Sequence, residues 1–135
     1  VITGGTGGIG SALVRQLATE GHSVVFICRD ERRAGAQVTK LSNDFVNTQQ
    51  VGYRVIDLSS APKRIISSMA HGLFDGRTDV LINNAAVCEH GSDKATFETA
   101  LRVNVQAPIS LAEALLPGMV ARRFGRIINV SSGDG

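Results

Sequence analysis

The sequence has no tryptophan, one tyrosine and only 4% aromatic residues in 135, so it offers little surface on which nucleic-acid bases could stack. It also lacks an excess of charge of one sign. Fourteen Lys and Arg against 12 Asp and Glu give a formal +2, which is too weak to indicate the clustered basic face of a nucleic-acid-binding protein. No apolar run approaches the ~20 residues of a membrane-spanning helix. We therefore expect neither nucleic acid nor a membrane as a partner.

Cysteine is scarce as well. Cys28 and Cys88 are far apart and match no metal-ligand spacing, so we expect reduced thiols in a cytoplasmic protein and no metal site. The sequence has no initiating methionine and no signal peptide, and it closes on Ser131-Ser132-Gly133-Asp134-Gly135. Both ends look cut, which predicts that the chain is part of a longer protein.

Short β-branched apolar runs alternate with longer segments of helical period. The runs predict five strands buried on both faces, at residues 1–3, 23–28, 51–56, 79–83 and 126–130. Four helices are predicted between them, at residues 8–20, 31–43, 61–74 and 97–123. In the first helix, Ile9, Leu13 and Leu17 form the stripe expected to face the core. The alternation predicts an α/β fold, a doubly wound parallel sheet whose ligands bind at the carboxyl ends of the strands.

Glycine is concentrated at the start of the chain, where five of the 15 glycines lie in Thr3-Gly4-Gly5-Thr6-Gly7-Gly8-Ile9-Gly10. This stretch follows the first predicted strand and opens the first predicted helix, as a dinucleotide-binding loop does. Glycine allows a tight turn and lets backbone N–H groups approach a pyrophosphate, to which the helix N-terminus adds its positive end. The alternative, a glycine-rich turn without a ligand, is disfavoured by this placement. The letters fit both G-x-G-x-x-G and T-G-x-x-x-G-x-G.

Four later motifs favour the second pattern. They are Asp57-Leu58 after the third predicted strand, Asn83-Asn84-Ala85-Ala86 at the end of the fourth, Asn104 in Arg102-Val103-Asn104-Val105, and Ser131-Ser132 after the fifth. In this order they resemble the short-chain dehydrogenase/reductase family, with Ala86 where its N-N-A-G has glycine. The resemblance covers the whole chain. It implies a Rossmann-like, incomplete NAD(P)-binding domain over residues 1–135, the first five strands of a larger single domain, with the fifth strand as an exposed edge.

The resemblance implies hydride transfer between a nicotinamide cofactor and a carbonyl or alcohol carbon of a small molecule. The cofactor-binding residues it implies are Gly4, Thr6, Gly8, Ile9, Gly10, Arg29, Asp57, Leu58, Asn84, Ala85 and Ala86. It also implies that Ser132 holds the substrate oxygen and that Asn104 anchors a water relay. Pro108 has no N–H, so it leaves the Asn104 carbonyl without its helical donor. A helix kink without a chemical role is the alternative at this point.

The end of the second predicted strand distinguishes the two nicotinamide cofactors, because a carboxylate there binds the ribose 2′-OH whereas a basic residue attracts a 2′-phosphate. Counting ~20 residues past the loop reaches Asp30 and favours NAD. Alignment with the family pattern instead puts the position at Cys28, followed by Arg29, with Arg32 and Arg33 nearby. We therefore prefer NADP(H), leave NAD(H) open, and expect Asp30 to turn away or to pair with an arginine. The alternative is that the three arginines form a solvated helix start.

The family's catalytic Tyr, with a Lys four residues after it, is missing from this sequence. Tyr53 is followed four residues later by Asp57 and falls in the third predicted strand, at the far edge of the sheet. We expect the chain as given to be inactive, since proton transfer needs such a group. The alternatives to an oxidoreductase are a non-catalytic NADP(H)-binding sensor or scaffold and, against the loop spacing, an epimerase or dehydratase. Residues 132–135 resemble the carbonyl-reductase branch, which implies a monomer, whereas other branches form homo-oligomers.

Overall fold

The computed structural model describes residues 1–44, 50–88 and 93–132. Residues 133–135, which carry most of the resemblance to the carbonyl-reductase branch, lie outside this part. The chain divides into two compact units. The first unit comprises Val1–Ile56, Ile82–Asn84 and Asn129–Gly135, and the second comprises Asp57–Leu81 and Ala85–Ile128.

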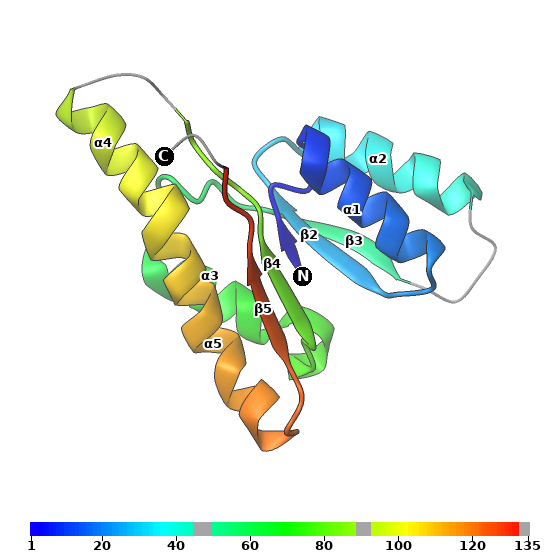
Figure 1. Ribbon diagram of the computed structural model, residues 1–135. Coiled ribbons are helices and arrows are strands. Elements are labelled where there is room, and N and C mark those ends of the chain that lie inside the picture. Colours follow the sequence, from blue (N-terminus) through cyan, green and yellow to red (C-terminus); the bar gives the residue numbers. More distant parts are fainter. Residues whose placement is uncertain (45–49, 89–92, 133–135) are drawn as a thin grey trace. The chain divides into compact units, whose positions relative to one another are not determined.

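Five strands form one parallel sheet in the order β3-β2-β1-β4-β5 (Figure 1). They are β1 (Ile2–Thr3), β2 (Val24–Cys28), β3 (Val51–Val55), β4 (Val80–Asn83) and β5 (Arg126–Asn129). Each lies within one residue of its predicted bounds, and the predicted doubly wound α/β fold is confirmed. The strand order reverses between β1 and β4, which is where ligands bind in open sheets of this kind.

In the first unit, α1 (Gly8–Thr19) packs against β1 and β2, and α2 (Glu31–Asp44) packs against β3. All five residues of β2 are buried, as predicted for a strand covered on both faces. The predicted inward stripe of α1 is wrong by one position. The buried residues are Gly10, Val14 and Ala18, whereas Ile9 is 63% exposed. Glycine and alanine let the helix axis approach the sheet closely, and the helix therefore turns its small residues inward.

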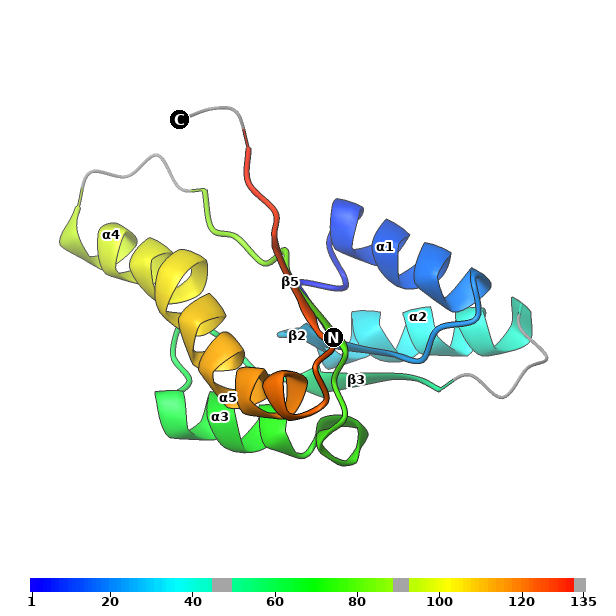
Figure 2. The same cartoon turned by 60° about the horizontal axis from the view of Figure 1, so that its bottom comes forward.

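The second unit contains α3 (Lys63–His71), η1 (Leu73–Gly76), α4 (Lys94–Leu101), η2 (Arg102–Gln106) and α5 (Ala107–Ala121). Helix α3 lies along α5 (Figure 2). The predicted helix 61–74 is too long, because Phe74 and Asp75 adopt left-handed backbone angles, with φ of 50° and 53°. The predicted helix 97–123 starts too late, because the Asp93 carboxylate accepts a hydrogen bond from the Thr96 N–H and caps α4. Two hydrogen bonds from Thr96 lower the pKa of Asp93.

The turn that carries Phe74 and Asp75 is held by one arginine at the end of α5. The Arg122 guanidinium donates to the carbonyl oxygens of Gly76 at 3.2 Å and Thr78 at 2.8 Å, and it lies 3.5 Å from the Asp79 carboxylate. Only 25% of the Arg122 side chain is exposed, so its bonds are partly shielded from water. Arg122 therefore compensates carbonyl groups that no regular element satisfies.

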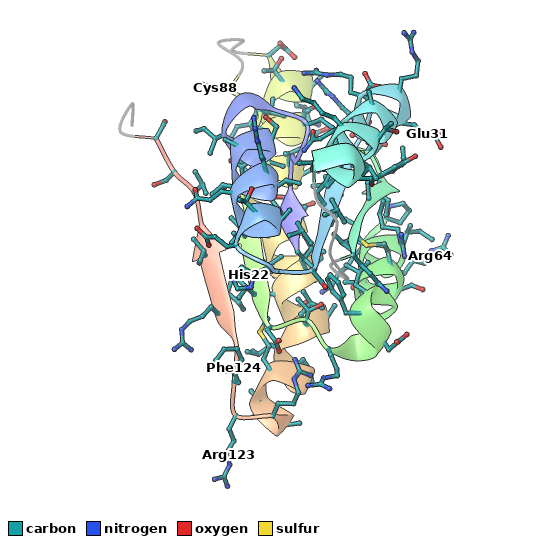
Figure 3. The ribbon with its side chains drawn as sticks, turned by 90° about the vertical axis from the view of Figure 1, so that its right-hand side faces the viewer. His22, Glu31, Arg64, Cys88, Arg123 and Phe124 are labelled. Carbon is teal, nitrogen blue, oxygen red and sulfur yellow. The ribbon has the colours of Figure 1, made fainter. Side chains whose placement is uncertain are left out.

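Replacing Arg122 by methionine is expected to lower the free energy of unfolding by about 2 kcal/mol, because charged donors to two carbonyls are lost, of which the bond to Thr78 is partly buried. The matched control is Arg123→Met. Arg123 is the next residue after Arg122, and its side chain points away from the rest of the chain (Figure 3). Urea unfolding followed by circular dichroism measures both. Equal stability of the two variants would contradict the role assigned to Arg122.

The fifth strand stands at one edge of the sheet, as expected, and all four of its residues are exposed. Its two isoleucines, Ile127 and Ile128, are 37% and 47% exposed. None of the helices in the described part of the chain is long and apolar enough to cross a membrane.

Candidate functional site

The glycine-rich loop turns sharply at the carboxyl end of β1. The N–H groups of Gly4 and Gly5 both donate to the carbonyl oxygen of Ile27, at 2.9 and 3.2 Å, which ties the loop to β2. The N–H of Gly7 then donates to the Gly4 carbonyl at 3.1 Å and closes the turn. Gly4 has a φ of 69°, in the left-handed region that favours glycine. The loop is therefore tied to the backbone of β2 and closed by a hydrogen bond of its own.

Three glycines of the loop differ in what a side chain would meet. A methyl group at Gly5 would overlap the Phe26 side chain, and one at Gly10 would overlap the Gly4 carbonyl and the Asn84 amide. A methyl group at Gly8 would meet nothing within 4 Å. Packing therefore explains why residues 5 and 10 are glycine, and it leaves residue 8 unexplained by the chain itself.

The open side of Gly8 coincides with the start of α1. The first backward hydrogen bond of this helix runs from the Ser11 N–H to the Gly7 carbonyl, at 2.7 Å. Helical N–H groups before that point have no partner inside a helix, and the helix dipole makes them attractive to an anion. The loop thus offers open space, unpaired donors and positive potential at one place, and it fits a pyrophosphate.

Asn84 links the end of β4 to this loop. Its backbone N–H donates to the Thr3 hydroxyl at 2.9 Å, and its side-chain amide donates to the carbonyls of Thr3 at 3.0 Å and Gly4 at 3.4 Å. The structure thereby brings three predicted residues together, Gly4, Gly10 and Asn84. They meet between β1 and β4, at the reversal of strand order.

Three functional groups follow one another at the end of β2: the Cys28 thiol, the Arg29 guanidinium and the hydrogen-bonded Asp30 carboxylate. Cys28 is buried, its thiol donates weakly to the Arg54 carbonyl over 3.7 Å, and burial is the main cause that raises its pKa, so it stays neutral. The Asp30 carboxylate accepts the Arg33 backbone N–H at 3.0 Å and caps α2. Asp30 is therefore turned toward the helix, one of the two outcomes expected for it. Among the described residues Arg29 forms no ion pair and is exposed.

Two residues of α2 contact the loop: Arg33, which was expected only to add positive charge near Arg29, and Gln37, for which no role was expected from the sequence. The Arg33 guanidinium donates to the Thr6 carbonyl at 3.1 Å, and the Gln37 side-chain amide donates to the Gly5 carbonyl at 3.1 Å. Their spacing of four places both on one helix face. That spacing is a weak signal, because nothing in the sequence says which face of α2 looks toward the loop.

In the second unit, Asn104 holds the chain that follows β4. Its side-chain amide donates to the Val87 carbonyl and accepts from the Val87 N–H, both at 2.9 Å. Asn104 lies in η2, a π-helical turn that ends two residues before Pro108, so the kink weighed as the alternative at this proline takes the form of a widened turn. The side chain is thus bonded to the backbone of Val87 in both directions, and the predicted water anchor at its main-chain carbonyl stays a prediction.

The remaining predicted residues are placed as follows. The Asp57 carboxylate accepts from the N–H and the hydroxyl of Ser59, at 2.9 and 2.7 Å, whereas Leu58 is buried in the second unit. Ala85 is half-buried and Ala86 is exposed. The described non-glycine residues with positive φ are Phe74, Asp75 and Arg123, so alanine at position 86 causes no backbone strain.

Ser132 is exposed, in the first unit. It follows β5, which is joined to β4 by a 2.9 Å hydrogen bond between the Asn83 and Asn129 side chains. In the part of the chain that the structure describes, no three His, Cys, Asp or Glu side chains gather as a metal site. The ligand roles assigned to Ser132 and to the residues of the second unit stay predictions.

Comparison with known proteins decides the family. A family model described as short chain dehydrogenase matches residues 1–135. The chain belongs to the short-chain dehydrogenase family. Dehydrogenase/reductase SDR family member 13 of Homo sapiens is 32% identical over 132 residues, which cover 98% of this chain and 35% of the human protein. L-xylo-3-hexulose reductase of Hypocrea jecorina is 35% identical over 157 residues, covering 98% of this chain and 51% of the fungal protein.

Solved structures of short-chain dehydrogenases superpose closely on this chain. A metagenomic short-chain oxidoreductase in complex with NADP has a TM-score of 0.87 at 33% identity, over 98% of this chain and 61% of that one. A short-chain dehydrogenase from Sphingobium yanoikuyae in complex with NADPH has a TM-score of 0.87 at 28% identity, over 98% and 52%. The chain therefore spans about a third to three-fifths of these relatives. The resemblance read from the five motifs is confirmed at the level of the family, but not of the branch.

Proposed function

We propose that this chain is the dinucleotide-binding part of an NADP(H)-dependent oxidoreductase that acts on a carbonyl or alcohol group of a small molecule in the cytoplasm. The loop carries the proposal. Gly8 is the position at which the chain leaves room for a ligand, and it lies at the N-terminus of α1, where unpaired N–H groups favour a pyrophosphate. Bound NADPH would supply the hydride to a carbonyl carbon, and bound NADP+ would accept it from an alcohol carbon.

Residues at the end of β2 support NADP(H) over NAD(H). Position 28 carries a neutral buried thiol that does not repel a phosphate, and the Asp30 carboxylate is occupied as the cap of α2. Arg29 is exposed beside them, and a guanidinium binds phosphate with two parallel hydrogen bonds. The two relatives described above with bound nucleotide hold NADP and NADPH.

Two further residues are proposed to act on the substrate side. A hydroxyl both donates and accepts, so Ser132 would hold an oxygen that changes between carbonyl and alcohol. Asn104 would place a water through its main-chain carbonyl, while its side chain fixes the backbone at Val87. The reductase names of the relatives favour an oxidoreductase over a non-catalytic scaffold.

The cofactor preference is tested by replacing Arg29 with methionine. The variant is expected to bind NADPH about tenfold more weakly and NADH with unchanged affinity, because one charge-assisted contact to the 2′-phosphate is lost. Titration of nucleotide fluorescence measures both affinities, and the chain has no tryptophan to interfere. Arg64→Met is the matched control, since Arg64 is an exposed arginine of α3 (Figure 3). Tighter binding of NADH than NADPH by the unaltered chain would refute the NADP(H) assignment.

A further inference from the structure

Arg33 and Gln37 of α2, here called the α2 strut, hold two consecutive carbonyl groups of the loop. Gln37 donates to the Gly5 carbonyl and Arg33 to the Thr6 carbonyl, each at 3.1 Å. Both residues project from α2 one turn apart, and the cap that starts this helix is Asp30. The bonds join segments about 30 residues apart in the sequence, so they are tertiary contacts, separate from the turn's own hydrogen bonds.

The direction of these carbonyls determines the direction of the neighbouring N–H groups. The described peptide bonds are all trans, so the carbonyl of one residue and the N–H of the next point to opposite sides. Drawing the Gly5 carbonyl toward α2 turns the Thr6 N–H away from it. Drawing the Thr6 carbonyl the same way turns the Gly7 N–H toward the Gly4 carbonyl, the bond that closes the turn.

An anion is repelled by carbonyl oxygens and attracted by N–H groups, so a loop that binds one has to point its carbonyls elsewhere. We propose that Arg33 and Gln37 are positioning residues, which keep the loop in the conformation that receives the pyrophosphate of the dinucleotide. The inference rests on the proposed function, and it deepens it by assigning α2 a role that does not involve the 2′-phosphate. The strut acts through the backbone, so it serves NADPH and NADH alike.

This equal effect separates the strut from a phosphate contact. A residue that binds the 2′-phosphate alters the affinity for NADPH alone, because NADH has no such group. Gln37 gives the sharper test of the two residues, since it is uncharged and half-buried. Gln37→Leu removes the donor and keeps a side chain of similar size.

The experiment measures NADPH and NADH affinities of the chain and of Gln37→Leu by fluorescence titration. Loss of one orienting hydrogen bond is expected to weaken both affinities by about fivefold and by the same factor. Gln37→Lys, which restores a donor of similar reach, is expected to recover most of this loss. The matched control is Gln16→Leu, because within the described part of the chain the Gln16 side chain bonds Glu20 alone, on the exposed face of α1. Hydrogen exchange at residues 4–8 without nucleotide is followed in parallel, and Gln37→Leu is expected to speed it.

Each result decides between the ideas. Unchanged affinity for both nucleotides in Gln37→Leu, or a loss confined to NADPH, overturns the strut and leaves the proposed function standing. If the unaltered chain binds neither nucleotide, the proposed function fails, and the positioning role fails with it. Faster hydrogen exchange at residues 4–8 in Gln37→Leu would then show only that Gln37 supports the loop structurally, without a role in nucleotide binding.

Discussion

Alanine at position 10 is expected to lower the free energy of unfolding by about 3 kcal/mol, one of the larger effects of a single added methyl group. The reason is that the new Cβ would overlap the Gly4 carbonyl and lie 2.7 Å from the Asn84 amide nitrogen. Neither atom is free to retreat. Gly4 is fixed by its hydrogen bond to Ile27, and the Asn84 side chain is bonded to Thr3 and Gly4.

Urea unfolding followed by circular dichroism measures this loss. The control is Gly8→Ala, which adds the same methyl group two residues earlier where nothing lies within 4 Å. The control is expected to leave the stability within about 1 kcal/mol of the original, or to raise it, because alanine favours a helix over glycine. A Gly10→Ala variant as stable as this control would show that the contact between the loop, α1 and the end of β4 is not as close as described.

The second large effect concerns nucleotide affinity. Here Gly8→Ala, the harmless control for stability, is expected to be the more damaging of the two glycine variants. Gly8→Ala is expected to weaken binding of NADPH and NADH by about 5- to 150-fold, the equivalent of the 1–3 kcal/mol that forcing an extra methyl group into a filled space costs. The methyl group would occupy the side of the loop from which a pyrophosphate approaches. Stability and affinity therefore separate at this position.

Fluorescence titration of both nucleotides checks this expectation, with unfolding curves to show that the variant is folded. Ser11→Ala serves as a nearby control on α1. Among the residues that the structure describes, the Ser11 hydroxyl bonds the Gly8 carbonyl alone, and its loss leaves the loop open. Full nucleotide affinity in Gly8→Ala would mean that the open side of the loop is not the binding site. The proposed function would then have lost the observation on which it stands.

The strands were predictable because of where they lie. A central strand such as β2 is covered on both faces, so its sequence is an unbroken apolar run with no competing helical period. The helix ends were harder to predict. The left-handed angles at Phe74 and Asp75 end the third helical segment early, and no residue type there demands them. The residues that follow them, Gly76 and Thr78, are held by Arg122, which comes from the end of a helix far along the chain.

Prediction of the site had a similar limit. The glycine loop and Asn84 could be recognised from the sequence, because the turn requires particular residue types at fixed spacing. The carboxylate reached by counting from the loop, Asp30, proved to be a helix cap, and a count of residues cannot tell a cap from a ribose ligand. The contacts of Arg33 and Gln37 depend on how α2 is rotated about its axis, which only tertiary packing determines.

The exposed fifth strand has a consequence for handling the chain in solution. A strand at a sheet edge presents unpaired backbone donors and acceptors to any other strand that approaches. Ile127 and Ile128 are exposed on alternate faces, and Arg126 is the only charged residue of β5. Such an edge has little charge to prevent pairing with another copy, so we expect concentrated samples of the isolated chain to aggregate through β5.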